Sequence, residues 1–328
     1  MNEARTMLEN ADLRIEIASQ GGELVRIYDK KHSREVLWEG RPEIWGRHAP
    51  ILFPFIGKCA DGAYHYQGTR YPMSAHGFAR DMEFSLLSKT DREVWYGLSD
   101  TEKTREVYPF SFRLETGHRL EDNKIRVMWK VVNPGDKDLY FMLGGHPAFK
   151  TPEGLGVHDF TLDFHQEGPV HFQAPDEDGF QVDELSDLLV LNEGKAAITP
   201  GFFERALTYI FDQGQVKTIS LLLPGDEPYV TVHSFRTPYM GVWTMEETHP
   251  FVCLEPWFGR CDKAGYNGEL SDREGVMKLA VGQEFTADKA LTALWYWSEC
   301  YPSSFLLNGK KVEHIDFSFY MLYRCYYI

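Results

Sequence analysis

The sequence predicts an all-β protein, a large antiparallel β-sandwich with a few short helices. Runs in which apolar and polar residues alternate recur along the chain, and Gly, Pro, Asn and Asp separate them. No long segment has a helical period. Many short strands bounded by turn residues are typical of an antiparallel sandwich or barrel, which can hold a chain of this length in one domain.

The predicted strands follow one another with short breaks. The first two form a hairpin, because residues 13–17 alternate apolar and polar side chains, Gly21 and Gly22 interrupt the run, and residues 23–28 resume it. Further strands are predicted at residues 94–98, 112–120, 125–132, 218–223, 229–235 and 241–245, with a turn at Asp122 and Asn123. Only residues 183–191 and 201–209 have the pattern of short helices or helical turns.

The end of the chain differs in character from the rest. We expect residues 1–290 to form a single sandwich domain, since no internal repeat or low-complexity linker divides them. Residues 291–328 are rich in Trp, Tyr and Phe and show little alternation. They are either an additional structural element or the product of a frameshift or read-through, and the sequence leaves both open.

Composition excludes several classes of partner. The net charge of −15 would repel phosphate backbones, so we expect no nucleic-acid partner. No apolar run reaches membrane-spanning length and the first ten residues have no apolar signal core, so we expect a cytoplasmic protein without a membrane partner. Five cysteines without a CxxC pair argue against a disulfide framework and a zinc ribbon, and favour reduced thiols.

The first of four unusual clusters spans residues 45–58. Its apolar run contains two prolines and a glycine, which predicts a rigid loop or an edge strand. The cations Arg47 and Lys58 bracket the run. They are either site residues or ordinary surface charges.

The second cluster spans residues 75–80. His76 precedes a glycine, so its ring can stand exposed on an open turn, and Arg80 can return to the same site. A purely structural role for both residues remains the alternative.

The third and fourth clusters place ionisable groups in apolar surroundings. His146 follows two glycines and precedes a proline, which holds it in an extended conformation suited to acid–base work, although a core histidine would fit as well. Glu255 lies in the middle of an apolar strand, where a carboxylate is costly unless it is used or paired. Its neighbours would desolvate it and make it a stronger base. Trp257 offers a flat apolar face to a sugar.

Other catalytic motifs are missing from the sequence. It contains no GxSxG, no Gly-rich phosphate loop and no HExxH, and its histidines lack metal-ligand spacing. We therefore expect no metal and no cofactor. A Ser–His–Asp triad has no support in the pattern.

Taken together and in this order, the four clusters resemble the aldose 1-epimerase family of the galactose mutarotase-like superfamily, in its divergent bacterial branch. The similarity covers roughly residues 10–290, and the matching stretches are residues 50–58, 76–80, 145–149 and 253–259. The resemblance implies a galactose mutarotase-like supersandwich that binds a sugar in an open cleft. It also implies a mechanism without a metal, in which an aldose ring opens to the aldehyde and closes again to the other anomer.

The resemblance also implies roles for individual residues. Glu255 matches the general base that takes the proton of the anomeric hydroxyl, and His146 matches the general acid that protonates the ring oxygen. His76 matches a histidine that binds and polarises the sugar near the ring oxygen. Lys58 stands where many members carry a substrate-binding arginine. Arg47 and Arg80 resemble the cations that line the site in the sugar-phosphate branch of the family.

Two departures leave the substrate open. Galactose mutarotases carry a sugar-binding aspartate, and the nearest stretch here, residues 203–207, has none at the matching point. Lysine at position 58 also loses the fork of an arginine. We therefore expect an isomerase of the mutarotase type acting on an aldose. The alternatives are a hexose-6-phosphate 1-epimerase and a non-catalytic carbohydrate-binding protein on the same fold.

Other properties follow from the same interpretation. A glycosidase or lyase is disfavoured, because no second carboxylate stands in a comparable motif. The expected partner is a small sugar or sugar phosphate, and the protein is expected to be a monomer or a homodimer.

Overall fold

The computed structural model describes residues 4–182, 185–204, 207–234, 236–293, 305–307 and 310–312. By its internal contacts the chain divides into two compact units, residues 1–294 and residues 295–328. The described part of the second unit is a hairpin of β26 (Phe305–Leu307) and β27 (Lys310–Val312). The question raised by the aromatic tail lies otherwise outside the described residues.

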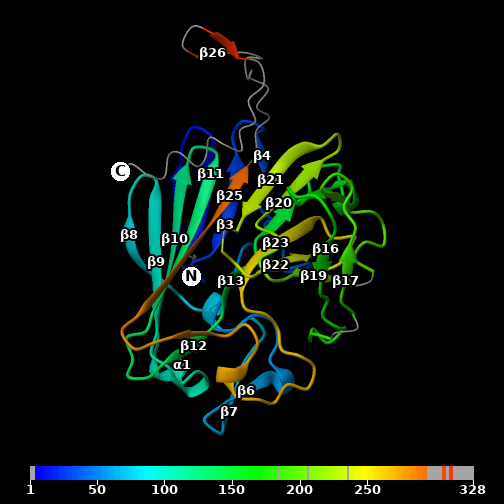
Figure 1. The fold of residues 1–328 in the computed structure, drawn as a ribbon. Coiled ribbons are helices and arrows are strands. Elements are labelled where there is room, and N and C mark those ends of the chain that lie inside the picture. The colour runs from blue at the N-terminus through cyan, green and yellow to red at the C-terminus, as the bar shows by residue number, and fades with distance from the viewer. Residues whose placement is uncertain are drawn as a thin grey trace. The chain divides into compact units, whose positions relative to one another are not determined.

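The largest sheet of the first unit has nine strands, which pair antiparallel (Figure 1). Its strands in spatial order are β18 (Lys195–Ala197), β15 (Thr161–Asp163), β20 (Thr218–Leu223), β21 (Glu227–His233), β25 (Glu284–Ala293), β11 (Lys124–Val132), β10 (Arg113–Glu121), β9 (Glu93–Ser99) and β8 (Ser85–Lys89). β25, the last strand of this unit in the sequence, therefore lies between β21 and β11 in the interior of the sheet.

Two smaller sheets accompany the large one. A four-stranded sheet consists of β1 (Arg5–Glu9), β2 (Leu13–Ala18), β3 (Leu24–Asp29) and β4 (Arg34–Glu35). A six-stranded sheet consists of β19 (Thr208–Phe211), β22 (Tyr239–Trp243), β23 (Phe251–Phe258), β13 (Leu143–Gly145), β5 (Ile51–Leu52) and β14 (Ala148–Lys150), the last paired with β23.

Short elements complete the unit. Three two-stranded ribbons pair β6 (Ala63–Tyr66) with β7 (Thr69–Pro72), β12 (Leu139–Phe141) with β24 (Met277–Leu279), and β16 (Val170–Phe172) with β17 (Asp187–Leu189). The described helices are α1 (Glu102–Val107) and the 3₁₀ turns η1 (Ala60–Gly62), η2 (Ala79–Asp81), η3 (Val157–Asp159) and η5 (Leu270–Asp272).

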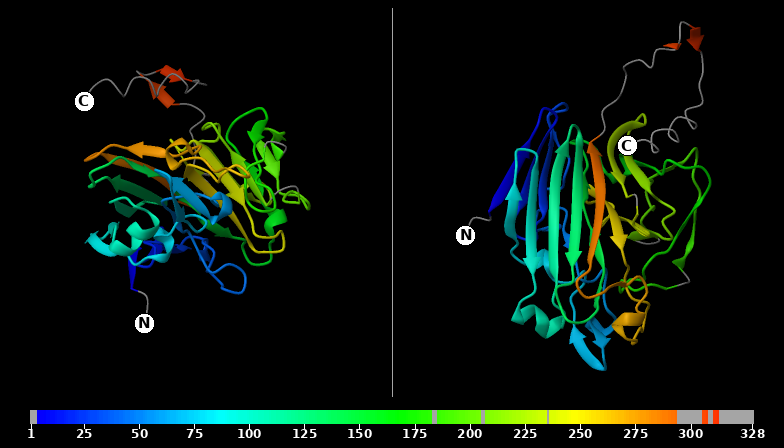
Figure 2. Two further views of the ribbon diagram at one scale, coloured as in Figure 1. Left: turned by 90° about the horizontal axis from the view of Figure 1, so that it is seen from below. Right: turned by 60° about the vertical axis from the view of Figure 1, so that its left-hand side comes forward.

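Alternation along the strands determines which face of the large sheet is buried. In β11, Ile125, Val127, Trp129 and Val131 are buried, and the residues between them lie on the other face. The buried face packs against the two smaller sheets, as Figure 2 shows for the blue N-terminal strands. Thr6 on β1 hydrogen-bonds the Tyr96 hydroxyl on β9 at 2.7 Å. The predicted all-β sandwich is therefore confirmed.

The predicted hairpin and the six further strands match strands of the structure to within a few residues. The two segments predicted as short helices or helical turns agree with the structure only near their starts, where Leu185 is in a 3₁₀ conformation and residues 201–204 form turns. Asp187–Leu189 forms β17 and Thr208–Phe211 forms β19 instead. The α-helix of the described residues, α1, was not predicted. It has six residues, fewer than two turns, and the Thr101 hydroxyl caps it by accepting a hydrogen bond from the backbone N–H of Thr104 at 3.1 Å.

Candidate active site

One face of the six-stranded sheet forms the floor of a pocket of about 310 Å³. The register of β22 and β23 pairs Gly241 with Glu255, and that of β19 and β22 pairs Ile210 with Gly241. Because paired residues of antiparallel strands point to the same face, Glu255 and Ile210 face the pocket together. β23 is buried along its whole length, so its carboxylate is held in an apolar setting.

His146 stands directly across from Glu255. Two strands pair with β23 in the same register: Gly144 of β13 lies opposite Trp257, and Ala148 of β14 lies opposite Cys253. His146 lies midway between Gly144 and Ala148, so the register places it opposite Glu255. The Nε2 atom of His146 lies 3.2 Å from the Oε2 atom of Glu255. The two side chains, 8% and 1% exposed, lie buried side by side at the bottom of the pocket.

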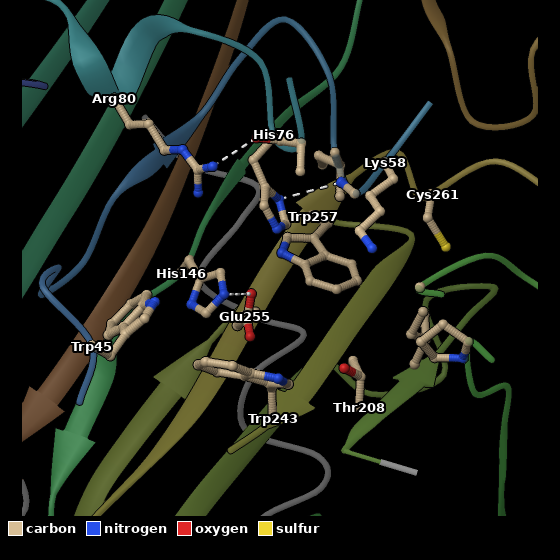
Figure 3. A pocket seen from close by; sticks show the side chains of 16 residues that line it. Trp45, Lys58, His76, Arg80, His146, Thr208, Trp243, Glu255, Trp257 and Cys261 are labelled. Carbon is tan, nitrogen blue, oxygen red and sulfur yellow. Dashed lines mark hydrogen bonds and ion pairs between the residues drawn. The ribbon is translucent and has the colours of Figure 1, made fainter. Parts of the chain in front are cut away.

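Aromatic rings surround the His146 imidazole (Figure 3). The Trp45 ring lies 5.0 Å from it with the planes tilted by 30°, and the Trp243 ring lies 5.1 Å away edge-on. The His76 ring completes the group at 5.6 Å, also edge-on. Such packing restricts the imidazole to one orientation beside the carboxylate.

His76 enters the pocket from a tight turn. Its backbone has a φ of 65°, which is uncommon for a residue with a side chain, and Gly77 follows with a φ of 73°. The turn is held because the His76 N–H donates to the Gly57 carbonyl at 2.8 Å. In return the Gly57 N–H donates to the Nδ1 atom of His76 at 3.2 Å.

This second bond determines the tautomer of His76. An Nδ1 that accepts a hydrogen bond carries no proton, so the neutral ring carries its proton on Nε2. Burial lowers the pKa of His76 to about 3, and the charges of Arg80 and Arg47 add to the effect. The residue is therefore a neutral donor through Nε2.

Two cations lie in the pocket wall. Arg80 donates from Nη2 to the Ala75 carbonyl at 2.7 Å, and burial lowers its pKa to about 10. Lys58 donates from Nζ to the carbonyl of Asp178 at 2.5 Å. Lys58 thereby meets the acidic loop at residues 175–179, which supplies Pro175 and Gly179 to the pocket lining.

Arg47 does not line the pocket. Its Nη2 atom forms an ion pair with Asp81 at 2.8 Å, so an acidic neighbour satisfies the guanidinium. The expectation that Arg47 binds substrate thus has no support from its position. The other predicted site residues, His146, Glu255, His76, Lys58, Arg80 and Trp257, all line the pocket.

A buried ion pair fixes the segment that carries Lys58. Arg273 Nε lies 2.7 Å from Asp262 Oδ1, and both side chains are almost fully buried. The Arg273 guanidinium also donates to the carbonyls of Ile56 and Lys58 at 3.5 and 3.4 Å. Ile56 and Lys58 flank Gly57, whose N–H donates to His76.

Several pocket residues were missed by the sequence interpretation: Trp45, Ile56, Thr208, Ile210, Trp243 and Cys261. Trp45 and Ile56 lie within the first cluster, residues 45–58, but were not selected there, and no local motif connects the other four. Glu255 is the one acidic side chain among the described residues that line the pocket. β19 follows residues 203–207, where a sugar-binding aspartate was sought, and it contributes Thr208 and Ile210 to the pocket lining.

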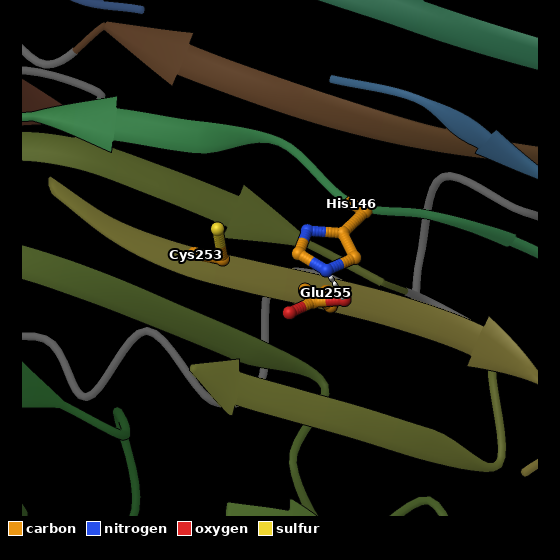
Figure 4. A group of neighbouring side chains, drawn as sticks. All are labelled: His146, Cys253 and Glu255. Atoms are coloured by element: carbon orange, nitrogen blue, oxygen red, sulfur yellow. Dashed lines mark ion pairs between the residues drawn. The ribbon is translucent and has the colours of Figure 1, made fainter. Parts of the chain in front are cut away.

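A third potential metal ligand lies next to the acid–base pair. This residue is Cys253 (Figure 4). Its Sγ atom, a ring nitrogen of His146 and a carboxylate oxygen of Glu255 all lie within 4.8 Å of one another. However, burial, together with the charge of Glu255, raises the pKa of the Cys253 thiol well above its usual range. A metal would bind the thiolate, so the site favours a protonated thiol over a metal ligand.

A Ser–His–Asp grouping lies elsewhere in the molecule. His165 Nε2 is 2.7 Å from Ser220 Oγ, and Asp163 Oδ2 is 3.9 Å from His165 Nδ1. Ser220 is fully buried and hydrogen-bonds Thr231 at 2.6 Å. Its hydroxyl cannot reach a substrate, so this grouping does not form a hydrolase site.

Comparisons with known proteins agree with one another. Residues 5–267 match the family model described as aldose 1-epimerase. The plasmid-encoded protein LacX of Lactococcus lactis is 26% identical over 282 residues, which cover 83% of this chain and 93% of LacX. In the part of this chain that the structure describes, no helix is long and apolar enough to span a bilayer.

Solved structures give the same result. A galactose mutarotase related enzyme from Lactobacillus acidophilus superposes with a TM-score of 0.84 at 30% identity, over 90% of this chain and 99% of that one. A galactose mutarotase-like protein from Lactobacillus casei superposes with a TM-score of 0.81 at 27% identity, over 88% of this chain and 99% of that one.

Proposed function

We propose that this chain, which belongs to the aldose 1-epimerase family, interconverts the α and β anomers of an aldose by acid–base ring opening. The observation that carries the proposal is the His146–Glu255 pair, 3.2 Å apart at the floor of a sugar-sized pocket. A protein that only binds sugar has no need of such a pair, whereas ring opening requires one proton to be removed and another to be delivered.

The proposed reaction uses both groups at once. The Glu255 carboxylate takes the proton of the anomeric hydroxyl, and the electron pair of that O–H bond forms the carbonyl at C1. The bond between C1 and the ring oxygen breaks, and the ring oxygen takes a proton from His146. Rotation about C1–C2 and the reverse steps close the other anomer. His76 donates from Nε2 to a sugar oxygen, and Trp257 provides the floor on which the sugar rests.

The test is exchange NMR of anomer interconversion over a panel of aldoses with the wild-type protein. Glu255→Gln should remove most of the acceleration, by about 10²–10⁴-fold, because the amide keeps the shape but cannot accept the proton. His146→Asn should lower kcat more than it raises KM, since its proton is delivered in the transition state. Full activity in Glu255→Gln would show that the base is wrong. Tight sugar binding by a wild type that never accelerates exchange would establish the binding-protein alternative.

A phosphorylated sugar is the second candidate substrate. Lys58 and Arg80 line the pocket, and Glu255 is the one carboxylate among its described lining residues, so the wall opposite the base is cationic in a protein of net charge −15. A second observation favours Arg80: its Nε atom is buried and makes no hydrogen bond to a described residue, although it lies 4.0 Å from Asp81 Oδ2. Phosphate oxygens accept such charge-assisted hydrogen bonds.

Arg80→Ala separates the two substrates. If phosphate is recognised, KM for a hexose 6-phosphate should rise at least about tenfold more than KM for the free hexose, since a charge-assisted contact contributes about 1.5–3 kcal/mol. Arg47→Ala is the matched control, because Arg47 is paired with Asp81 outside the pocket lining and should affect both substrates equally. Equal effects of Arg80→Ala on both sugars would leave the neutral aldose as the substrate.

A further inference from the structure

The Trp257 indole is fixed flat on the pocket floor. It lies across the sheet over two glycines, since a Cβ at Gly144 would be 2.7 Å from its Cδ1 atom and a Cβ at Gly241 would be 2.9 Å from its Cη2 atom. The side chain is 5% exposed. One face of the ring therefore rests on the sheet, and neither glycine can be enlarged without lifting it.

The indole N–H points into the pocket without an acceptor. Its Nε1 atom is buried and makes no hydrogen bond to any described residue. In Figure 3 the edge that carries this atom faces the space between His76, His146 and Glu255. A buried N–H without a partner destabilises the fold, so a native protein keeps one where a ligand supplies the acceptor.

Glu255 determines which ligand atom lies there. Trp257 follows it by two positions on the same strand, so both side chains project from the same face of the sheet. In the proposed reaction the anomeric oxygen must lie within hydrogen-bond reach of the Glu255 carboxylate, whereas the ring oxygen lies toward His146. The space that the indole N–H faces beside Glu255 is thus where the anomeric oxygen is held.

We propose that Trp257 is a catalytic residue that donates a hydrogen bond from Nε1 to the anomeric oxygen of the sugar. This inference rests on the proposed ring opening. While the proton of the anomeric hydroxyl passes to Glu255, negative charge develops on that oxygen until the bond between C1 and the ring oxygen has broken and the carbonyl has formed. A fixed donor stabilises this charge without reorganisation, and the indole itself gives up no proton.

The kinetic test is Trp257→Phe, which keeps an aromatic floor and removes the N–H. We expect kcat for anomer exchange to fall about 10²-fold, at the lower end of what one donor to a developing oxyanion contributes, with KM changed much less. Replacement of Trp257 by benzothienylalanine, which has sulfur in place of the N–H, should reproduce the loss with the size of the ring retained. Trp95→Phe is the matched control, because its N–H donates to Glu93 on β9 and the residue does not line the pocket. Wild-type kcat in a folded Trp257→Phe protein would overturn the proposal.

A binding test uses two analogues that differ at C1. The 1,5-lactones of gluconic and galactonic acid carry a carbonyl oxygen there, and the corresponding 1,5-anhydrohexitols carry none. In ¹⁵N–¹H spectra, the Nε1–H signal of Trp257, identified by its loss in the variant, should move downfield with saturating lactone and stay in place with anhydrohexitol. No movement with lactone, or equal movement with both, would overturn the proposal even if Trp257→Phe failed to fold. If the shift were specific to lactone but the protein never accelerated anomer exchange, the hydrogen bond from Trp257 would be supported and the proposed function would be refuted.

Discussion

His76 shows how one backbone bond determines what a side chain can do. The Gly57 N–H occupies its Nδ1 atom at 3.2 Å, so the ring meets the pocket as a donor. Neighbouring Arg80 and Arg47 oppose a charge on the ring, and burial opposes it more. Together these make His76 a poor general acid, which agrees with the proposal that His76 binds the sugar and that His146, paired with Glu255, transfers the proton.

The lowered pKa of His76, about 3, makes stability depend on pH. In the unfolded chain the ring takes up a proton below about pH 6.5, while in the folded protein it stays neutral until about pH 3. Between these values the unfolded state binds more protons, so the free energy of unfolding should fall as the pH falls. His76 contributes at most about 1.4 kcal/mol per pH unit, and less where pocket water reaches the ring.

Denaturant unfolding of wild type and His76→Asn at several pH values between 6.5 and 3 measures this contribution. The variant has no ring to protonate, so its stability should decline less steeply with falling pH, whereas other titrating groups affect both proteins alike. Parallel curves would mean that His76 becomes charged in the folded protein as readily as in the unfolded chain.

At the scale of elements, the segment from Phe55 to Ala60 depends on a distant ion pair. Arg273 covers the Phe55 ring at 4.5 Å, and Asp262 accepts a hydrogen bond from the Ala60 N–H at 2.9 Å. The pair thus holds both ends of the segment that contributes Gly57 and Lys58 to the pocket lining.

Arg273→Met should destabilise the protein strongly. It leaves the Asp262 carboxylate buried without its partner, which typically costs about 3 kcal/mol or more. The double variant Asp262→Asn, Arg273→Met removes both charges and should recover part of the loss. Denaturant midpoints of the three proteins test this, and a loss below about 1 kcal/mol in the single variant would show that the pair is not structurally important.

The elements also show where sequence patterns are informative. Strands with one buried face, such as β2 and β11, alternate and were predicted. β19 has three consecutive buried residues, so its pattern resembled a helix as much as a strand. α1 was missed because a helix of six residues is too short to show an apolar period, and its signal is the Thr101 cap.

The same reasoning applies to the site. His146 and Glu255 could be selected because each is costly in an apolar segment, and the strand register then pairs them. Trp45 and Thr208 could not, since an aromatic or a threonine in a loop or strand has many ordinary roles. Arg47 had the same local appearance as Arg80, and both lie near Asp81, but only Arg80 lines the pocket.

At the scale of the whole molecule, we expect a chain ending at Ala293 to fold and keep its activity. β25 ends there, after pairing with β11 along its length and with β21 at its C-terminal end. A chain ending at Gly282 lacks β25 and should fail to fold, because the large sheet would be divided in two. Solubility, thermal unfolding and anomer exchange of the two truncated proteins test this. Aggregation of the longer one would show that residues 294–328 belong to the fold.

The interior position of β25 has a consequence for biosynthesis. A ribosome makes the strands of the nine-stranded sheet in sequence order, so β8–β11 and β15–β21 emerge first as two separate blocks. Until β25 follows, β11 and β21 each present an unpaired edge to solvent or to another nascent chain. Closure joins residues far apart in sequence and is expected to be slow. Aggregation during synthesis should therefore be greatest just before β25 completes the first unit. A chaperone that covers open strand edges at that stage should increase the yield of folded protein most.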